Sequence, residues 1–273
     1  MSTVTSFAND RLRWVRRLAG DRRARRREGL WVAEGVHLAE EVLREGLPVR
    51  LWVLEQGWGA GAGRQARLRE EAQRRGAQVL EVRRGLLREV ADTETPQGVL
   101  VVFEAPEGEA EGEGQAEAVL AGEGPAVVLD RVQDPGNLGT IARTAEGAGA
   151  RGLLLGPGCA DPGSPKALRA SAGALLRLPA VRVPDPLALL RGAGRPLYAT
   201  AGQGGVIYDR APLAGAFALL LGQEGGGLDR RWREQADLLL TVPMAGRLES
   251  LNVAAAAAVI LFEAARQRRA GPG

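Results

Sequence analysis

The stretch that decides the fold is "ESLNVAAAAAVILFE", from Glu249 to Glu263, in which polar residues directly precede a run of alanines and large apolar residues. Asn252 is a residue type that caps helices, so the pattern predicts a helix over Asn252 to Ala265. Capping of this helix explains the presence of one of the two polar residues, Ser250 and Asn252, but not of both. A helix that is apolar all round must be buried, in its own subunit or against another, which favours a site formed between subunits.

The apolar segments before this helix indicate a parallel sheet. They are nearly continuous runs with helical segments between them, as expected for strands covered on both faces. The runs are "AVVLD", "GLLLG", "VRVP", "PLYATA", "FALLLG" and "LLLTVP". Ligands of such sheets bind beyond the carboxyl ends of the strands, so the residues after each run are the candidates for a site.

Two of these segments carry polar residues with open interpretations. In "QDPGNLGTIART", Asn137 and Arg143 either face a ligand or serve as a helix cap and a surface cation. In "GQEGGGLD", glycines allow close backbone approach, but phosphate binding is no more strongly indicated than a tight turn. Glu224 in this loop suits a cationic ligand or an arginine partner.

The N-terminal part alternates helical patterns with the expected strands "VRLWVLE", "AQVLEV" and "GVLVVFE", which predicts a small α/β domain over residues 1–104. Residues 105–124 are acidic and glycine-rich and predict a linker, followed by a second domain over 125–273. A length of 273 residues with 45% hydrophobic residues is enough for two packed cores.

Composition excludes several classes of protein. The single cysteine, Cys159, and single histidine, His37, exclude an internal disulfide, a Cys/His zinc cluster and Ser-His or Cys-His catalysis, so no metal is expected. No apolar run is long enough for a bilayer and no signal peptide is visible, so we expect a cytoplasmic protein that does not enter membranes.

Basic residues concentrate in "RLRWVRRLAGDRRARRREG", from Arg11 to Gly29, and predict a nucleic-acid contact, although a solvated helix in an arginine-rich protein gives the same pattern. The only lysine, Lys166, lies on one helical face with Arg169. The candidate RNA-binding residues are Arg11, Arg16, Arg22, Arg23, Arg25, Arg26, Lys166 and Arg169.

Taken together, the segments resemble the TrmH (SpoU) family of RNA ribose methyltransferases in the SPOUT superfamily. "NLGTIAR", "GQEGGGL" and "VPMAGRLESLNVAAAAAVILFE" look like its three motifs, "SPKALRASAGA" is also typical, and the N-terminal part looks like the family's L30e-like substrate-binding extension. The order and spacing of the motifs make the resemblance specific.

The resemblance implies an α/β SPOUT fold with a C-terminal deep trefoil knot, S-adenosylmethionine as cofactor and a homodimer. It also implies catalytic roles for Asn137, Arg143, Glu224, Ser250 and Asn252. The implied cofactor-binding residues are Thr200, Ala201, Leu221, Gly222, Glu224, Val242, Met244 and Leu251. One departure is Ala254, where many relatives have a hydroxyl residue.

The implied reaction is methyl transfer to a ribose 2′-hydroxyl, with Arg143 stabilising the developing alkoxide, because a guanidinium hardly deprotonates in proteins. The two-domain arrangement favours 23S rRNA over tRNA as the substrate. A tRNA 2′-O-methyltransferase, a non-catalytic RNA-binding protein and a base methyltransferase of the same superfamily remain as alternatives.

Overall fold

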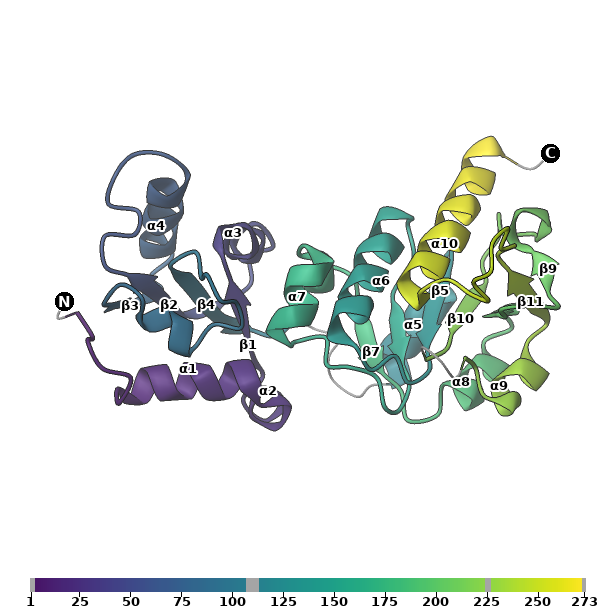
Figure 1. Ribbon diagram of the computed structural model, residues 1–273, viewed down its shortest axis with the longest axis horizontal. Coiled ribbons are helices and arrows are strands. Elements are labelled where there is room, and N and C mark those ends of the chain that lie inside the picture. The colour runs from purple at the N-terminus through teal and green to yellow at the C-terminus, as the bar shows by residue number, and fades with distance from the viewer. Residues whose placement is uncertain (1–2, 107–112, 224–226, 272–273) are drawn as a thin grey trace. The chain divides into compact units, whose positions relative to one another are not determined.

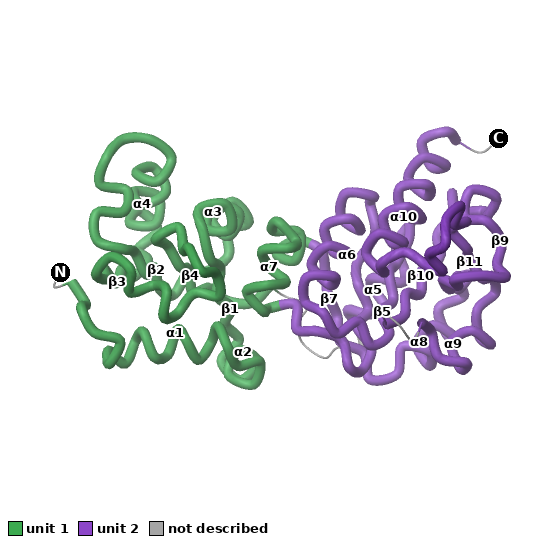
Figure 2. Tube along the Cα trace, in the orientation of Figure 1, with its two compact units in different colours: residues 1–106, 163–177 green, residues 107–162, 178–273 purple. Residues whose placement is uncertain are grey.

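The computed structural model describes residues 3–106, 113–223 and 227–271, and it divides into two compact units (Figures 1 and 2). Unit 1 takes residues 1–106 together with 163–177, and unit 2 takes residues 107–162 and 178–273. The predicted domain of 125–273 therefore contributes one segment, 163–177, to the compact unit formed by the N-terminal part.

Unit 1 is built on a four-stranded sheet in the order β1-β4-β2-β3, in which β2 and β3 are parallel and β4 is antiparallel to β1 and β2. It confirms the small α/β domain, although the first strand was not predicted. Its elements are α1 (Asp10–Gly20), α2 (Arg22–Glu28), β1 (Leu30–Glu34), α3 (Val36–Arg44), β2 (Val49–Glu55), α4 (Arg64–Arg74), β3 (Gln78–Val82), η1 (Leu86–Glu89), β4 (Val99–Glu104), α7 (Pro165–Ser171) and η2 (Ala174–Leu176).

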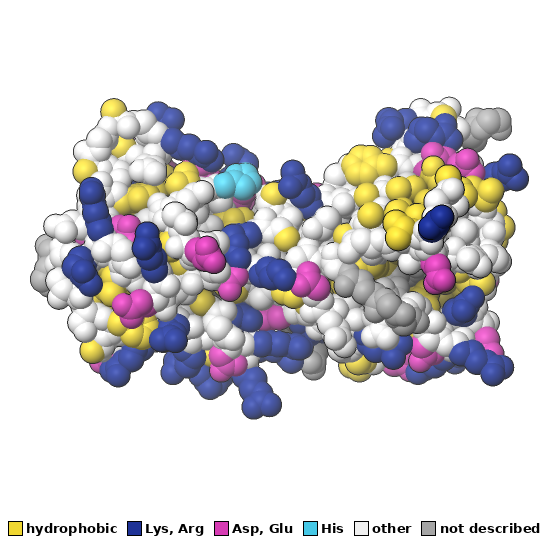
Figure 3. Space-filling model, in the orientation of Figure 1, with side chains coloured by type: hydrophobic (Ala, Val, Ile, Leu, Met, Phe, Trp, Pro, Cys, Tyr) yellow, Lys and Arg dark blue, Asp and Glu magenta, His cyan; other side chains and the backbone are white. Residues whose placement is uncertain are grey.

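Helix α1 has two different faces. The Asn9 side chain caps it by accepting hydrogen bonds from the backbone of Arg11 and Leu12. Its residues Leu12, Val15 and Leu18 recur at helical spacing and are fully buried against the sheet. The arginines of α1 and α2 therefore point mostly to solvent, and basic side chains gather over these helices in Figure 3.

Arg25 is the exception in this basic segment. It is only 3% exposed, and its guanidinium donates hydrogen bonds to the carbonyl oxygens of Leu18 (2.6 Å) and Ala19 (2.8 Å). These carbonyls belong to the last turn of α1, where backbone acceptors have no partner within the helix. Arg25 thus joins α2 to α1. This structural role differs from the predicted role of Arg25 in contacting RNA.

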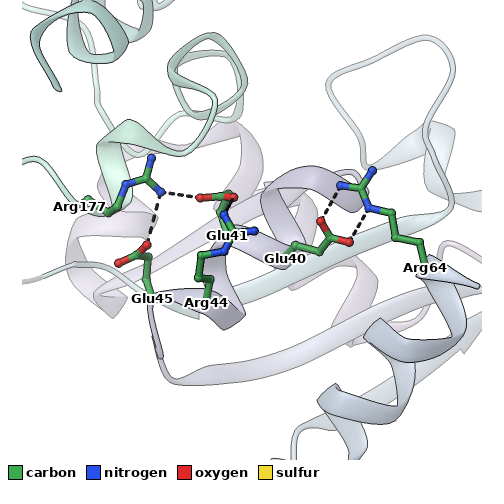
Figure 4. Close-up of polar contacts among 6 residues, drawn as sticks. All are labelled: Glu40, Glu41, Arg44, Glu45, Arg64 and Arg177. Carbon is green, nitrogen blue, oxygen red and sulfur yellow. Dashed lines mark hydrogen bonds and ion pairs between the residues drawn. The ribbon is translucent and has the colours of Figure 1, made fainter. Parts of the chain in front are cut away.

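Ion pairs hold the segment 163–177 within unit 1. Arg169 binds the buried Glu34 (3.3 Å) and Asp92 (2.5 Å), so its predicted role in RNA binding competes with a structural one. Figure 4 shows Arg177 reaching the buried Glu41 (2.5 Å) and Glu45 (3.5 Å). Loss of either arginine would remove a cation from a buried carboxylate, Glu34 or Glu41, which is costly, so these contacts favour the observed packing of the segment.

Glu40 on the same helix, α3, faces a different partner (Figure 4). The Arg64 guanidinium binds both of its oxygens at 2.5 Å and joins α3 to α4. Hydrogen bonds from Arg64 lower the pKa of Glu40. The pair lies near the surface, so its contribution to stability is small.

Unit 2 is a seven-stranded sheet in the order β7-β6-β5-β10-β8-β11-β9, and every strand pairing in it is parallel. This confirms the predicted parallel sheet. The elements are α5 (Glu113–Ala121), β5 (Ala126–Leu129), α6 (Pro135–Gly147), β6 (Leu153–Leu155), β7 (Ala180–Arg182), α8 (Pro186–Gly192), β8 (Leu197–Thr200), β9 (Val206–Ile207), η3 (Tyr208–Arg210), β10 (Ala218–Leu221), α9 (Arg230–Gln235), β11 (Leu238–Thr241) and α10 (Val253–Ala270).

Helices cover both faces of this sheet. One core joins α5, α8 and α9 to alternate strand residues such as Val128, Leu154 and Leu220. The strand residues between these point to the opposite face of the sheet. Helices α6 and α10 pack together and lie on that face, opposite α8 and α9 (Figure 1). The strands are thus buried on both faces, which is why their sequences are nearly continuous apolar runs.

Part of the predicted linker is folded. Residues 113–121 of the range 105–124 form α5, and Ala116, Val119 and Leu120 are buried in the core of unit 2. Because the stretch has few large apolar residues, its composition did not indicate the short helix α5, which buries one alanine, one valine and one leucine. Among the described residues, no helix is both long and apolar enough to cross a bilayer.

Candidate active site

A cavity of about 710 Å³ lies at the carboxyl ends of β8, β10 and β11, beside the start of α10. We call it the strand-end cavity. It is where a parallel sheet is expected to bind a ligand. Of the residues predicted from the sequence, it is lined by Thr200, Ala201, Gly222, Val242, Ser250, Leu251 and Asn252.

Two predicted cofactor-binding residues do not line the cavity. Leu221 is fully buried within β10, and Met244 is half-buried in the segment between β11 and α10; neither is among the residues that line the cavity. Glu224 lies outside the described residues. These positions show that proximity in sequence to a strand end does not determine which side chains face the cavity.

One wall of the cavity is held by Thr241. Its hydroxyl donates to the carbonyl oxygen of Ala201 (3.2 Å) and accepts from the backbone N–H of Gly205 (3.1 Å). A Cβ atom on Gly205 would lie 2.5 Å from the Leu239 carbonyl oxygen, so only glycine permits this close approach. One side chain thereby fixes both ends of the loop that carries Gly202 and Gln203 into the lining.

A second part of the lining comes from Gly222, Gln223 and Gly227, at the described ends of the segment after β10. The backbone N–H of Gly227 donates to the Gln223 carbonyl oxygen (3.1 Å), and a Cβ on Gly222 would lie 2.6 Å from the Gly227 backbone. The two described ends of this segment therefore lie close together. Gly222 and Gly227 have no side chain and can offer the cavity only backbone groups, as expected where a ligand is bound by backbone groups.

Asn252 has two roles at once. Its Oδ1 caps α10 by accepting from the backbone N–H groups of Ala254 (2.9 Å) and Ala255 (3.3 Å). Its Nδ2 donates to Oδ1 of Asn137 (3.2 Å), 115 positions earlier in the chain. The expected cap of this helix is thus Asn252 and not Ser250, and the same amide joins two predicted catalytic residues.

Asn137 is not the cap of its helix. Asp134 caps α6, with its carboxylate accepting from the backbone N–H of Asn137 (2.9 Å). The interpretation of Asn137 as an N-cap is therefore wrong, and its side chain is directed to Asn252 instead. Arg143 lies further along α6 and is exposed to solvent, and it does not line the cavity in this structure.

Several lining residues were missed by the sequence analysis. Val253, Ala256 and Ile260 lie at helical spacing on the face of α10 that meets the cavity, so extending the period from Asn252 would have found them. Gln203, Gln223 and Glu249 also line it. No periodic signal in the sequence marks these three polar residues.

The cavity combines apolar side chains with exposed backbone groups. Leu240, Val242 and Ile260 offer an apolar surface, and the loops beside them offer peptide donors and acceptors. Its volume is within the usual range for a nucleotide-sized ligand. The described residues contain no group of three or more His, Cys, Asp or Glu that could hold a metal ion. Burial raises the pKa of the Cys159 thiol, which does not favour a nucleophilic thiolate.

Comparison with known proteins gives matches over nearly the whole chain. Residues 124–262 match the SpoU rRNA Methylase family, and residues 9–101 match the MRM3-like substrate binding domain. A Bacillus subtilis protein named 23S rRNA (guanosine(2553)-2′-O)-methyltransferase RlmP is 34% identical, and the match covers 96% of this chain and 98% of that one.

Solved structures agree over the same length. An AdoMet-bound rRNA methyltransferase from Sinorhizobium meliloti has a TM-score of 0.81 and 31% identity, covering 100% of this chain and 99% of its own. The AviRb SpoU methyltransferase from Streptomyces viridochromogenes, in complex with AdoMet, has a TM-score of 0.80 and 33% identity, covering 97% of this chain and 100% of its own.

Proposed function

Because the chain belongs to the SpoU rRNA methylase family, we propose that it transfers a methyl group from S-adenosylmethionine to a ribose 2′-hydroxyl of 23S rRNA. The observation that carries the proposal is the Asn252–Asn137 hydrogen bond, which joins two of the predicted motifs at the rim of the strand-end cavity. Relatives named as 23S rRNA 2′-O-methyltransferases support the substrate.

The residues of the strand-end cavity fit the cofactor. Leu240, Val242 and Ile260 would enclose its apolar parts, and the backbone of residues 200–203 and 222–223 would bind its polar edges. The Glu249 carboxylate, which also lines the cavity, would balance the positive charge of the cofactor. When bound, S-adenosylmethionine supplies an electrophilic methyl group carried on a sulfonium.

The remaining task of the protein is to align the ribose oxygen and assist the loss of its proton. Asn137 and Asn252, each fixed by the other, would bind the sugar, with Ser250 beside them. Arg143 would stabilise the negative charge that develops on the oxygen. The proton would pass to a phosphate oxygen or water, because a guanidinium is not a base at neutral pH. Alignment of this kind can contribute several kcal/mol, up to about 7 to 11.

We include in the proposal a homodimer, formed through α10, and the C-terminal trefoil knot. Phe262 on α10 is 50% exposed and Leu248 is 71% exposed, and hydrophobic side chains gather over the region of α6 and α10 in Figure 3. Such a patch favours association. Light scattering on the purified protein tests this: a monomeric mass at micromolar concentration would reject the dimer.

Unit 1 would bind the RNA through the exposed arginines of α1 and α2, namely Arg11, Arg16, Arg22, Arg23 and Arg26, with Lys166 on α7. Phosphate contacts of this kind supply affinity without reading sequence. A cytoplasmic location, where rRNA is modified, belongs to the same proposal.

The deciding experiment uses the purified protein, methyl-labelled S-adenosylmethionine and separate pools of 23S rRNA and tRNA. We expect label in 23S rRNA and a 2′-O-methyl nucleoside by mass spectrometry. Label in tRNA alone would mean that the substrate is tRNA and not 23S rRNA. Cofactor binding by calorimetry without methylation of any RNA would support the non-catalytic alternative.

A further inference from the structure

A second cavity, of about 730 Å³, lies within unit 1 at the end of the sheet where β1, β2 and β3 begin and β4 ends. We call it the Trp14 cavity. Its side-chain lining includes Arg11 and Trp14 from α1, Glu28 at the end of α2, and Arg50, Gln78 and Glu104 from three strands. None of these residues belongs to the proposed catalytic machinery.

The charges of the Trp14 cavity balance one another. Glu28 accepts hydrogen bonds from the Trp14 indole N–H (2.5 Å) and from Arg17 (3.1 Å). The hydrogen bond from Trp14, followed by the contacts of Arg27 and Arg17, lowers the pKa of Glu28. Glu104 pairs with Arg50 (2.5 Å). The Arg50 guanidinium is thus already paired with a carboxylate, and the lining offers a phosphate no surplus of positive charge.

A neutral ring with both donors and acceptors suits this lining better than an anion. Trp14 is half-buried, and the hydrogen bond to Glu28 fixes the plane of its indole beside the cavity. Glu28, Glu104 and the Arg50 guanidinium offer acceptors and donors, and the Gln78 amide offers one of each. These are the groups that bind unstacked bases, which proteins recognise by aromatic stacking and by hydrogen bonds to base edges.

The surroundings supply the complementary contact to a nucleic-acid backbone. Helix α1 contributes two of the lining residues, Arg11 and Trp14. Further exposed arginines follow along α1 and into α2. An RNA strand held by these arginines through its phosphates would run past the mouth of the cavity. Phosphate contacts position a strand, and base contacts give it specificity.

We propose that the Trp14 cavity receives one unstacked nucleobase of the RNA substrate, separate from the nucleotide whose ribose is methylated. The inference rests on the proposed function, because it requires that unit 1 bind RNA. It assigns to unit 1 a base-reading site and not only an electrostatic surface.

The test measures binding of the full-length protein to two fluorescent probes. One is a single-stranded RNA heptanucleotide, and the other has the same sugar-phosphate backbone with abasic analogues at every position. We expect the base-bearing probe to bind about 5-fold or more tightly, as stacking on an aromatic side chain contributes at least that much per base. Trp14→Leu should abolish this preference and leave the affinity for the abasic probe unchanged.

Two variants serve as controls. Trp14→Phe keeps an aromatic face and loses the indole donor, so it should retain most of the preference and rule out a general loss of folding. Tyr208→Leu removes a half-buried aromatic residue from unit 2 and should change neither affinity.

A full preference for the base-bearing probe in Trp14→Leu would overturn the inference and leave the proposed function intact. Equal loss of affinity for both probes would also overturn it, since the residue would then act on the backbone or the fold. Base preference in a protein that methylates no RNA would support the inference while rejecting the proposed function. Failure of the unmodified protein to bind either probe would reject both RNA contact by unit 1 and the inference.

Discussion

The two cavities are built from different parts of the chain. The strand-end cavity is lined mainly by glycines and aliphatic residues from loops that follow parallel strands and from α10, whereas the lining of the Trp14 cavity includes charged, amide and aromatic side chains. A site made of backbone is suited to holding one fixed cofactor. A site made of long polar side chains is suited to discriminating among bases, and substitutions in the two should affect different measurements.

The largest effect is expected at Arg143, in unit 2. Arg143→Lys should lower single-turnover methylation by about 100-fold or more, because the proposed role requires a planar guanidinium to stabilise the developing oxyanion and lysine offers only a point charge. Cofactor affinity should stay within about 2-fold. The matched control is Arg233→Lys, on α9. Methylation by Arg143→Lys at the unsubstituted rate would reject the role of Arg143.

Asn252→Asp separates capping from catalysis. Aspartate keeps the acceptor that caps α10 but loses the donor to Asn137, so thermal stability should be nearly unchanged. Methylation should fall at least about 10-fold, because misplacement of a substrate-binding group is costly. Asn252→Ala should lose both activity and about 1 kcal/mol of stability. If Asn252→Asp kept full activity, the hydrogen bond would have no part in the reaction.

The corresponding change in unit 1 is expected to act on RNA affinity alone. Arg22→Ala with Arg23→Ala should reduce the slope of log affinity against log salt by about 2, or one for each phosphate contact. The control pair is Arg67→Ala with Arg74→Ala on α4, a helix on the opposite side of the unit 1 sheet from α1 (Figure 1). Equal slopes for the two pairs would mean that RNA does not follow α1 and α2.

Thr241 tests whether the strand-end cavity depends on its backbone. Thr241→Val removes the hydroxyl that joins Ala201 and Gly205 while keeping the shape, and should weaken cofactor binding about 3- to 10-fold, the value of a typical hydrogen bond. Thr241→Ser should restore it. Because the cofactor site is affected, the KM for S-adenosylmethionine should rise while kcat changes little, and RNA affinity should stay constant. A serine variant as weak as the valine variant would show that the hydroxyl is not responsible.

The smallest effect is expected away from both cavities. Hydrogen bonds from Arg266 and Gln267 lower the pKa of Glu263 from 4.5 to about 2. Its stabilising contribution is therefore present above pH 4.5 and lost as the pH falls through about 2. Glu263→Gln should be less stable at pH 7 by under about 1 kcal/mol, since such surface pairs are weak. Urea unfolding should show the difference closing in acid, and a difference that persists at pH 2 would contradict this assignment.

Much of the architecture was predictable because it is local. The periods of apolar residues predicted β2, β3, β4, the strands of the unit 2 sheet other than β9, and the helix α10. The cap at Asn252 was predictable for the same reason, since a cap acts on the turn that follows it. Strand β1 was missed because "LWVAE" lies directly between two helical segments, and because all five residues are buried, so that it shows no alternation of buried and exposed positions.

The sequence by itself determined the class of fold and, through its motifs, the candidates Asn137, Ser250 and Asn252. Only the tertiary structure decided that the Asn137 side chain meets Asn252, that Arg169 pairs with Glu34, and that Thr241 fixes a wall of the cavity. Each of these depends on which partner a side chain meets. Periodicity and propensity describe a residue relative to its neighbours in sequence, whereas such partners lie up to 135 positions away and meet only when the chain has folded.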